Sequence, residues 1–257
     1  MSNIISFVSQ KGGVGKTTSA INLATAFAFG GYSVLLIDLD PQSSVRFSMG
    51  VNSKPAVGIK ELFLDTGTPI KELVQSTELD NMSFIFSNTD TLDLEKEILN
   101  ASNDPGFLLN RLKDDADAYD FIIVDAPSST NNMAINAICC SDLLILPIQC
   151  ESLAIKSLKR FLMAFNELQN SFTDRELKIA GILLTMYDRN VEVHRKVAQQ
   201  VYRVLTDSVF ETIIPRNDAI LEASALGKSV ITYKLNSIGA TAYIRLMNEL
   251  VDKFSLR

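Results

Sequence analysis

Unbroken apolar runs recur along the chain, and each is short enough to be a single strand. Residues 4–8 and 33–38, for example, are dominated by isoleucine, leucine, valine and phenylalanine. Runs without polar alternation are typical of parallel strands that are buried on both faces. The predicted strands cover residues 4–8, 33–38, 82–86, 121–125, 143–151 with an exit loop, 179–186 and 209–214.

Between these runs, apolar residues return every three or four positions, which is the spacing of one face of a helix. The first such segment follows residue 18 and ends at Gly30-Gly31, because glycine favours a helix terminus. In the acidic helix predicted over residues 91–99, the side chains expected to reach the core are Leu92, Leu94, Ile98 and Leu99. Further helices are predicted at residues 43–47, 59–63, 104–112, from 152 onwards, and at 191–205, 219–228 and 239–254.

Strands that alternate with helices predict an α/β fold, in which a mostly parallel twisted sheet carries helices on both faces. We find no internal repeat and no linker long enough to divide the 257 residues, so a single domain over residues 1–257 is expected. No apolar run approaches the ~20 residues of a membrane-spanning helix. The first residues run straight into the first predicted strand without the features of a signal peptide.

Charge is distributed unevenly. The formal net charge is −6, yet residues 61–120 alone hold 14 acidic and 4 basic side chains. We interpret this acidic stretch as a solvated face, which leaves room for a modest basic patch on the remaining surface. Cys139, Cys140 and Cys150 lie in apolar surroundings without the spacing of a metal site, so they are expected to be reduced core thiols. The single histidine, His194, is assigned to a surface position on a helix.

A glycine-rich loop stands between the first predicted strand and the first predicted helix. It reads Gln10-Lys11-Gly12-Gly13-Val14-Gly15-Lys16-Thr17-Thr18. Glycines allow consecutive backbone N–H groups to turn toward an anion, and the helix N-terminus adds partial positive charge. Lys16 is expected to reach the terminal phosphates of a nucleotide, and the Thr17 hydroxyl to bind Mg²⁺. The loop therefore predicts a site for a nucleoside triphosphate and magnesium.

Acidic side chains follow two of the predicted strands. Asp38 and Asp40 end the run at 33–38, and Asp125 ends the run at 121–125. In parallel sheets, ligands bind outside the carboxyl ends of the strands, next to such a loop. Asp125 is expected to hold Mg²⁺ through water, and of Asp38 and Asp40 one can hold a Mg²⁺-bound water while the other orients the attacking water.

These motifs resemble the deviant P-loop of the ParA/MinD family of partition and positioning ATPases. The resemblance rests on residues 10–18, 36–42, 121–127, 144–151 and 213–217 and extends over nearly the whole chain, although residues 50–115 match only loosely. Gln10 replaces the first glycine of the general P-loop pattern, and Lys11 supplies the family's extra lysine. After Pro127, Ser128 stands where the family usually has a small residue or proline.

The resemblance implies a function and a set of site residues. It implies an ATP- and Mg²⁺-dependent ATPase that closes into a homodimer, with Lys11 reaching the partner's nucleotide and Asp40 supporting hydrolysis. It assigns the phosphate loop to Lys11–Thr18, and the adenine pocket to Pro215 and Asn217. It also implies nonspecific DNA as a track, a ParB-like cargo adaptor that stimulates slow hydrolysis, and a cytoplasmic, nucleoid-associated protein. An N-terminal helix-turn-helix of the operator-binding kind is not expected.

DNA contacts in this family come from basic residues of the C-terminal helices. The matching bases are Arg195, Lys196, Arg203, Lys228, Lys234 and Arg245. Such bases either contact phosphates or merely solvate helix faces, and the loop at 234–238 carries one base only.

Two other classes of function, a membrane-associated ATPase and a metabolic enzyme, share the same loop. A MinD-like membrane-associated positioning ATPase requires a C-terminal amphipathic anchor, but residues 247–254 include Glu249 and Asp252. A nitrogenase-type reductase requires cluster cysteines, whose spacing the three cysteines do not provide, and a carboxylate-amide ligase is a further metabolic alternative. We therefore predict a partition or positioning ATPase.

Overall fold

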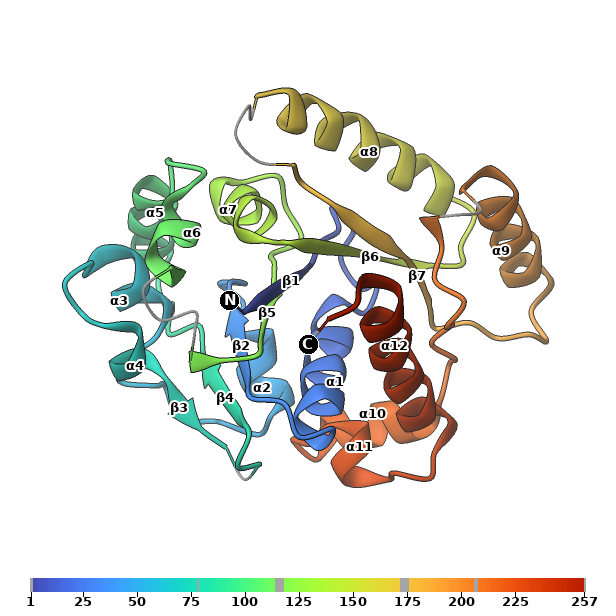
Figure 1. Ribbon diagram of the computed structural model, residues 1–257, viewed down its shortest axis with the longest axis horizontal. Coiled ribbons are helices and arrows are strands. Elements are labelled where there is room, and N and C mark those ends of the chain that lie inside the picture. The colour runs from blue at the N-terminus through green and yellow to red at the C-terminus, as the bar shows by residue number, and fades with distance from the viewer. Residues whose placement is uncertain (1, 78, 114–117, 172–175, 206–207, 257) are drawn as a thin grey trace.

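The computed structural model describes residues 2–256 except 78, 114–117, 172–175 and 206–207. Over these described residues, one seven-stranded sheet has the order β3-β4-β2-β5-β1-β6-β7 (Figure 1). The β3–β4 pair is antiparallel and the other pairs are parallel. The strands are β1 (Asn3–Phe7), β2 (Val34–Asp38), β3 (Gln75–Ser76), β4 (Met82–Ile85), β5 (Phe121–Asp125), β6 (Leu143–Gln149) and β7 (Ile179–Thr185).

Helices form a layer on each face of the sheet (Figure 1). One layer contains α1 (Lys16–Phe29), α2 (Ser44–Ser48), α10 (Asp218–Ala225), α11 (Val230–Tyr233) and α12 (Ile238–Phe254), with α12 packed along α1. The other contains α3 (Ile59–Leu64), α4 (Ile70–Leu73), α5 (Leu92–Ala101), α6 (Phe107–Leu112), α7 (Asn132–Cys140), α8 (Ala154–Ser171) and α9 (Glu192–Leu205).

The central strands bury both of their faces. On β5, Ile122 and Val124 enter the core beneath α3–α9, whereas Phe121 and Ile123 enter the core beneath α1 and α12. Alternate residues thus serve two different cores, which explains why the strand sequences are apolar without interruption. The predicted mostly parallel sheet with helices on both faces is confirmed.

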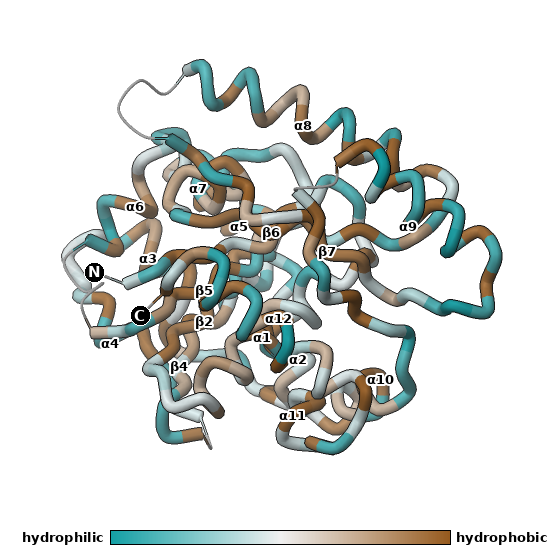
Figure 2. The backbone as a smooth tube through the Cα atoms, turned by 45° about the vertical axis from the view of Figure 1, so that its right-hand side comes forward, coloured by the Kyte–Doolittle hydropathy of each residue, from teal (hydrophilic) through white to brown (hydrophobic). Residues whose placement is uncertain are grey.

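Hydropathy along the backbone follows the same plan. In Figure 2 the strands are largely apolar, while α8 and α9 alternate between hydrophilic and hydrophobic segments. On α8, the buried side includes Leu158, Phe161 and Phe165. Among the described residues, none of the helices has both the length and the apolar character needed to cross a bilayer.

Two details of the sequence prediction are wrong. Residues 209–214 do not form a strand, since only isolated bridges join Val209 to Ile182 and Pro215 to Tyr187. The backbone N–H groups of residues 211 and 212 donate instead to the carboxylate of Glu249 on α12, at 2.7 and 2.9 Å, which interrupts the ladder. Leu92 is 75% exposed rather than part of the core.

The core positions predicted for α5 and for the cysteines are otherwise found where expected. Ile98 is buried, and Leu94 and Leu99 pack against the same core while partly buried. All three cysteines are buried, and none of them is in a disulfide. The short elements α4, β3 and α11 and the helix α7 were not predicted, because none of them carries a long periodic pattern.

Candidate functional site

The glycine loop connects β1 to α1 in the middle of the sheet. Gly13 has φ 75° and Gly15 has φ 85°, in the left-handed region that residues with a Cβ rarely adopt. A Cβ added to Gly13 would have no atom within 4 Å, so the loop faces open space. Gly15 is the N-cap residue of α1, which places the loop at the positive end of this helix. The loop therefore has the geometry of an anion cradle.

Lys16 is a buried cation at the start of α1. Its side chain is 5% exposed, and Nζ donates a hydrogen bond to Ser128 Oγ in the loop after β5. Burial lowers the pKa of Lys16, while the nearby carboxylates of Asp125 and Asp40 act in the opposite direction. An anion bound at the loop would stabilise the charged form of Lys16 and therefore raise its pKa again.

Two carboxylates lie on adjacent strands next to this lysine. Asp38 and Asp125 are direct register partners of β2 and β5, and both are fully buried. The Thr17 hydroxyl donates to Asp125 Oδ2 at 2.6 Å, whereas Asp125 Oδ1 is buried without a hydrogen-bond partner. Burial raises the pKa of Asp125 to about 7, against the opposing effects of Thr17 and Lys16. Burial and then the neighbouring charges of Asp125 and Asp40 raise the pKa of Asp38 well above its usual range.

This donor set fits a magnesium ion. Mg²⁺ prefers oxygen ligands and is usually bound by one or two carboxylates together with water and substrate phosphates. Thr17, Asp38 and Asp125 supply such oxygens, and Asp125 Oδ1 is an orphaned buried acceptor. In the part of the chain that the structure describes, no cluster of three or more histidine, cysteine or acidic side chains offers a metal site made by protein alone. Mg²⁺ bound here would therefore complete its coordination with phosphate and water oxygens.

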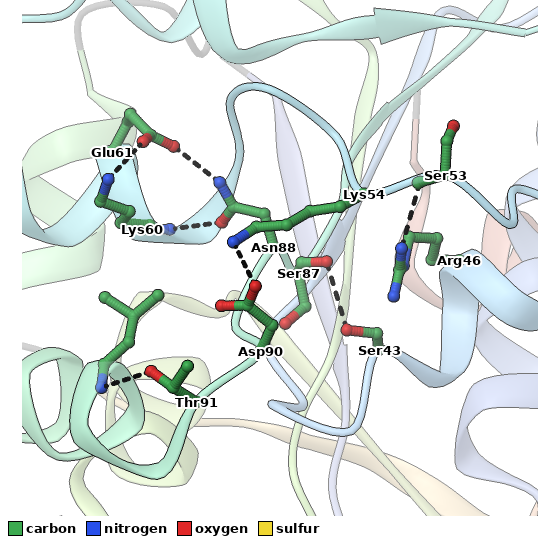
Figure 3. Close-up of polar contacts among 11 residues, drawn as sticks. Ser43, Arg46, Ser53, Lys54, Lys60, Glu61, Ser87, Asn88, Asp90 and Thr91 are labelled. Atoms are coloured by element: carbon green, nitrogen blue, oxygen red, sulfur yellow. Dashed lines mark hydrogen bonds and ion pairs between the residues drawn. The ribbon is translucent and has the colours of Figure 1, made fainter.

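Asp40 lies in the turn after β2 and is half-buried. Its N–H donates to Asp38 Oδ1 at 3.2 Å, and its own Oδ1 accepts the Gln42 N–H at 3.0 Å. The turn ends at Ser43, a non-glycine residue with φ 54°, whose hydroxyl donates to the Ser87 carbonyl at 3.2 Å (Figure 3). The exit of β4 thus fixes the loop that carries Asp40.

Polar contacts of residues 87–90, which follow β4, also hold the start of α3 and the loop before it. Asn88 accepts the Lys60 N–H and donates to Glu61 Oε2, both at 2.9 Å (Figure 3). Lys54, in the loop before α3, forms an ion pair with Asp90 at 2.6 Å (Figure 3). The start of α3 and the loop before it are therefore held against residues 87–90.

Lys11 is directed to the connection between β6 and α8. Its Nζ forms an ion pair with Glu151, and the two side chains are 33% and 43% exposed. Lys11, the extra lysine of the loop, therefore has an ion-pair partner within its own chain. Lys16 is instead directed to Ser128.

A cavity of about 290 Å³ opens beside the helix end of the loop. Gly15 and Thr18 form one wall, and Pro215 and Asn217 lie on the segment before α10. Asn217 Oδ1 is buried and has no hydrogen-bond partner. The structure therefore brings the two residues predicted for the adenine pocket against the glycine loop.

The same cavity is lined by two residues that the sequence prediction missed, Met186 and His194. Met186 follows β7 with φ 52°, and its Cε lies 3.5 Å from the position of a Cβ added to Gly15. His194 lies on a helix, as predicted, but in the first turn of α9 it is half-buried and lines this cavity. No local pattern indicates either contact, because both depend on how β7, α9 and the loop meet in space.

The six bases predicted to contact DNA are all exposed, but their surroundings differ. Lys196 pairs with Glu192 at 2.6 Å, and Arg195 donates to the Arg189 carbonyl at 3.2 Å. Arg245 lines a groove that also contains Glu211, Glu249 and Asp252. Arg203, Lys228 and Lys234 have no ion-pair partner among the described residues. These last three are the bases best placed to meet a polyanion.

The loop, the buried lysine and the paired strand-end carboxylates together define a protein of the P-loop nucleotide-binding class. Comparison with known proteins agrees with this class and narrows it. A family model described as an AAA domain matches residues 2–179. The chromosome partitioning protein ParA of Myxococcus xanthus (strain DK1622) is 34% identical over 250 residues, which cover 97% of this chain and 88% of that protein. The sporulation initiation inhibitor protein Soj of Bacillus subtilis (strain 168) is 32% identical over 250 residues, covering 97% and 98%. The chain belongs to the ParA/MinD family of partition and positioning ATPases.

Solved structures share the fold over its full extent. The cobyrinic acid a,c-diamide synthase of Mycobacterium smegmatis, with bound ATP analog and magnesium, has a TM-score of 0.83 and 27% identity, covering 99% of this chain and 96% of that chain. The septum site-determining protein MinD of Pyrococcus horikoshii OT3, complexed with Mg-ADP, has a TM-score of 0.80 and 26% identity, covering 99% and 98%. The predicted P-loop NTPase-like fold is confirmed.

Proposed function

We propose that the chain is a Mg²⁺-dependent ATPase that dimerises with ATP and positions or segregates a cargo by nucleotide-switched binding to nonspecific DNA. One arrangement carries the proposal. The buried Lys16, the Thr17 hydroxyl and the orphaned oxygen of Asp125 surround an open glycine loop, and a cavity lined by Pro215 and Asn217 adjoins that loop. In this proposal residues 1–257 act as one ATPase domain.

The loop and its neighbours would bind the nucleotide. Backbone N–H groups of Gly12–Gly15 and the Lys16 ammonium would hold the phosphates, with Thr18 at the border of the base cavity. Thr17, Asp38 and Asp125 would hold Mg²⁺, which supplies neutralisation of charge on the phosphate oxygens. The base would enter the cavity of Pro215 and Asn217.

Hydrolysis would depend on positioned charge rather than on a covalent intermediate. Asp40 lies beside both buried carboxylates and is held by the turn that ends at Ser43, so it is the residue best placed to orient an attacking water. Lys11 would leave Glu151 and reach the nucleotide of the partner subunit, as the family resemblance implies. Turnover without a partner protein is expected to be slow.

The proposed partners follow from the family. The named relatives are a chromosome partitioning protein and a sporulation initiation inhibitor. We place this chain in the cytoplasm, associated with the nucleoid in its ATP state, with a ParB-like or equivalent adaptor that stimulates hydrolysis. The cargo itself is a chromosome, a plasmid or a large protein complex.

The MinD-like membrane alternative finds less support in the structure. The helix considered for its anchor is α12, but Tyr243, Leu246 and Leu250 of this helix are buried in the core against α1. The apolar side of this helix is therefore already covered by protein, and no stable membrane anchor is proposed. The shared fold of the diamide synthase leaves the ligase alternative to be separated by experiment.

The proposal is tested by trapping the dimer. Asp40→Ala should bind ATP but hydrolyse it at least ~100-fold more slowly than the wild type, because a positioned acid–base group contributes about that much. Light scattering after gel filtration should show a long-lived dimer with ATP and a monomer with ADP. Asp90→Ala, an exposed acid outside the site, is the matched control. Wild-type turnover by Asp40→Ala, or a monomer in every nucleotide state, would contradict the proposal.

A further inference from the structure

His194 has a place in the structure that neither its sequence context nor the family motifs explain. It is the only histidine of the chain, and it lies half-buried in the first turn of α9. Its side chain lines the same cavity as Gly15, Pro215 and Asn217. A polar ring therefore faces the space assigned to the base of the nucleotide.

One hydrogen bond fixes the state of this ring. The backbone N–H of Asp188 donates to His194 Nδ1 at 3.0 Å. Nδ1 is therefore an acceptor without a proton, and the neutral imidazole carries its proton on Nε2. Nε2 has no hydrogen-bond partner in the part of the chain that the structure describes. His194 thus offers one oriented donor.

The segment that supplies this hydrogen bond is itself well held. Tyr187 donates its N–H to the Ile214 carbonyl at 3.1 Å and accepts the Arg216 N–H at 2.9 Å. Its ring lies 6.3 Å from the His194 ring, centroid to centroid. The residues before and after the cavity are therefore joined through Tyr187, which keeps His194 and Asn217 at the same opening.

The free donor of His194 suits an adenine base. Adenine presents ring nitrogens that accept hydrogen bonds. His194 Nε2–H is a donor with no protein partner among the described residues, and its residue lines the cavity beside the glycine loop. Asn217 Oδ1, in contrast, is buried and lies 2.9 Å from the position of a Cβ added to Gly239, so this oxygen is packed against α12.

We propose that His194 is a base-binding residue, which donates its Nε2–H to a ring nitrogen of the adenine. The inference rests on the proposed binding of ATP at the glycine loop and adds a contact that determines affinity for the base. The contact is made to the nucleoside, so it is the same for ATP and for ADP.

Two isosteric variants separate this role from the hydrogen bond to Asp188. In His194→Asn, the side-chain oxygen takes the place of Nδ1 and keeps the acceptor for the Asp188 N–H, but the donor is removed. In His194→Gln, the amide nitrogen extends to the position of Nε2 and keeps the donor. Affinities for ATP, ADP and 2′-deoxy-ATP are measured by calorimetry on the full chain, together with the Tm of each variant.

We expect His194→Asn to raise the Kd for all three nucleotides by the same factor, about 3- to 10-fold, as for the removal of one hydrogen bond. His194→Gln should recover most of this affinity. An Asn variant with wild-type affinity, or equal losses in both variants with equally lowered Tm, would overturn the inference in favour of a structural role. A loss that disappears with 2′-deoxy-ATP would overturn the assignment to the base. A wild-type chain that binds none of the nucleotides would overturn the proposed function as well, a pattern that no variant effect imitates.

Discussion

Two lysines flank the same glycine loop in opposite environments. Lys16 is almost fully buried and bonded to Ser128, whereas Lys11 is one-third exposed and paired with Glu151. An exposed ion pair contributes only about 0–1 kcal/mol to stability, so Lys11 can leave Glu151 with little cost to the fold. Lys16 has no such freedom, because a buried ammonium requires a partner at all times.

The first prediction concerns Lys16. Lys16→Ala should weaken ATP binding by about 100-fold, because the variant cannot form the charge-assisted hydrogen bond to the phosphates. A titration followed by calorimetry measures the change, and Lys159→Ala, an exposed base on α8, should bind ATP normally. Near-normal affinity of Lys16→Ala would show that the phosphates lie elsewhere.

The second prediction concerns Lys11 and its partner. Lys11→Ala should keep its ATP affinity within about threefold, since Lys16 remains, but should lose ATP-dependent dimerisation. Glu151→Gln removes the charge that holds Lys11 in the monomer, so dimers should form at a lower protein concentration than in the wild type. Sedimentation of both variants with ATP checks the two effects. Normal dimerisation by Lys11→Ala would remove the reason to separate this chain from ordinary P-loop ATPases.

At the residue scale, the sequence predicts a site residue when neighbouring residues along the chain determine its position. Thr17 and Asp125 were predictable because a loop–helix junction and a strand end place them, and the sheet then brings them within 2.6 Å. His194, Met186 and Glu151 were not predictable, because their contacts join segments that are distant along the chain.

At the scale of elements, the segment 209–214 shows how a tertiary contact overrides a strand pattern. Phe210 packs over Gly181 of β7, where an added Cβ would lie 2.9 Å from the ring. The following backbone N–H groups bind Glu249 instead of a neighbouring strand. The apolar pattern alone could not reveal a carboxylate arriving from α12.

The third prediction uses this close packing. Gly181→Ala should lower the free energy of unfolding by about 1–3 kcal/mol, because the new methyl group overpacks the site below Phe210. Urea denaturation gives the value. Gly67→Ala is the matched control, since its Cβ would meet only Asp65 Oδ1 at 3.5 Å, and its effect should stay within about 0.5 kcal/mol. Equal stability of the two variants would show that β7 and the segment at 210 can shift apart freely.

At the scale of the whole molecule, charge limits how the protein can meet DNA. The net charge is −6, so a DNA-binding surface must be local and must exclude the acidic stretch at 61–120. The proposed dimerisation would double a basic patch without changing its charge density. Arg203, Lys228 and Lys234 are exposed and have no ion pair among the described residues.

The fourth prediction follows from these bases. Random duplex DNA should bind in the presence of ATP and not ADP, with log Kd rising steeply with log salt concentration. Arg203→Ala or Lys234→Ala should each weaken binding and reduce the salt slope by about 0.9 for each phosphate that the variant no longer neutralises. Lys54→Ala, whose ion pair with Asp90 belongs to another part of the molecule, should leave the slope unchanged. Anisotropy at two salt concentrations measures this, and an absence of binding at low salt would favour a protein or membrane track.

The order of the sheet has a consequence for how the protein is made. The strand that leads into the loop, β1, lies between β5 and β6, and Asp38 meets Asp125 only after β5 is added. Asn217 and the α12 helix that covers α1 come later still. Parallel strands that are far apart along the chain pair slowly, because the segment between them must first lose conformational entropy. During synthesis, the growing chain carries an exposed P-loop for most of its length but acquires a complete nucleotide cavity only near the end. A ribosome-bound precursor would therefore be unable to enter the proposed nucleotide cycle before its last helices emerge.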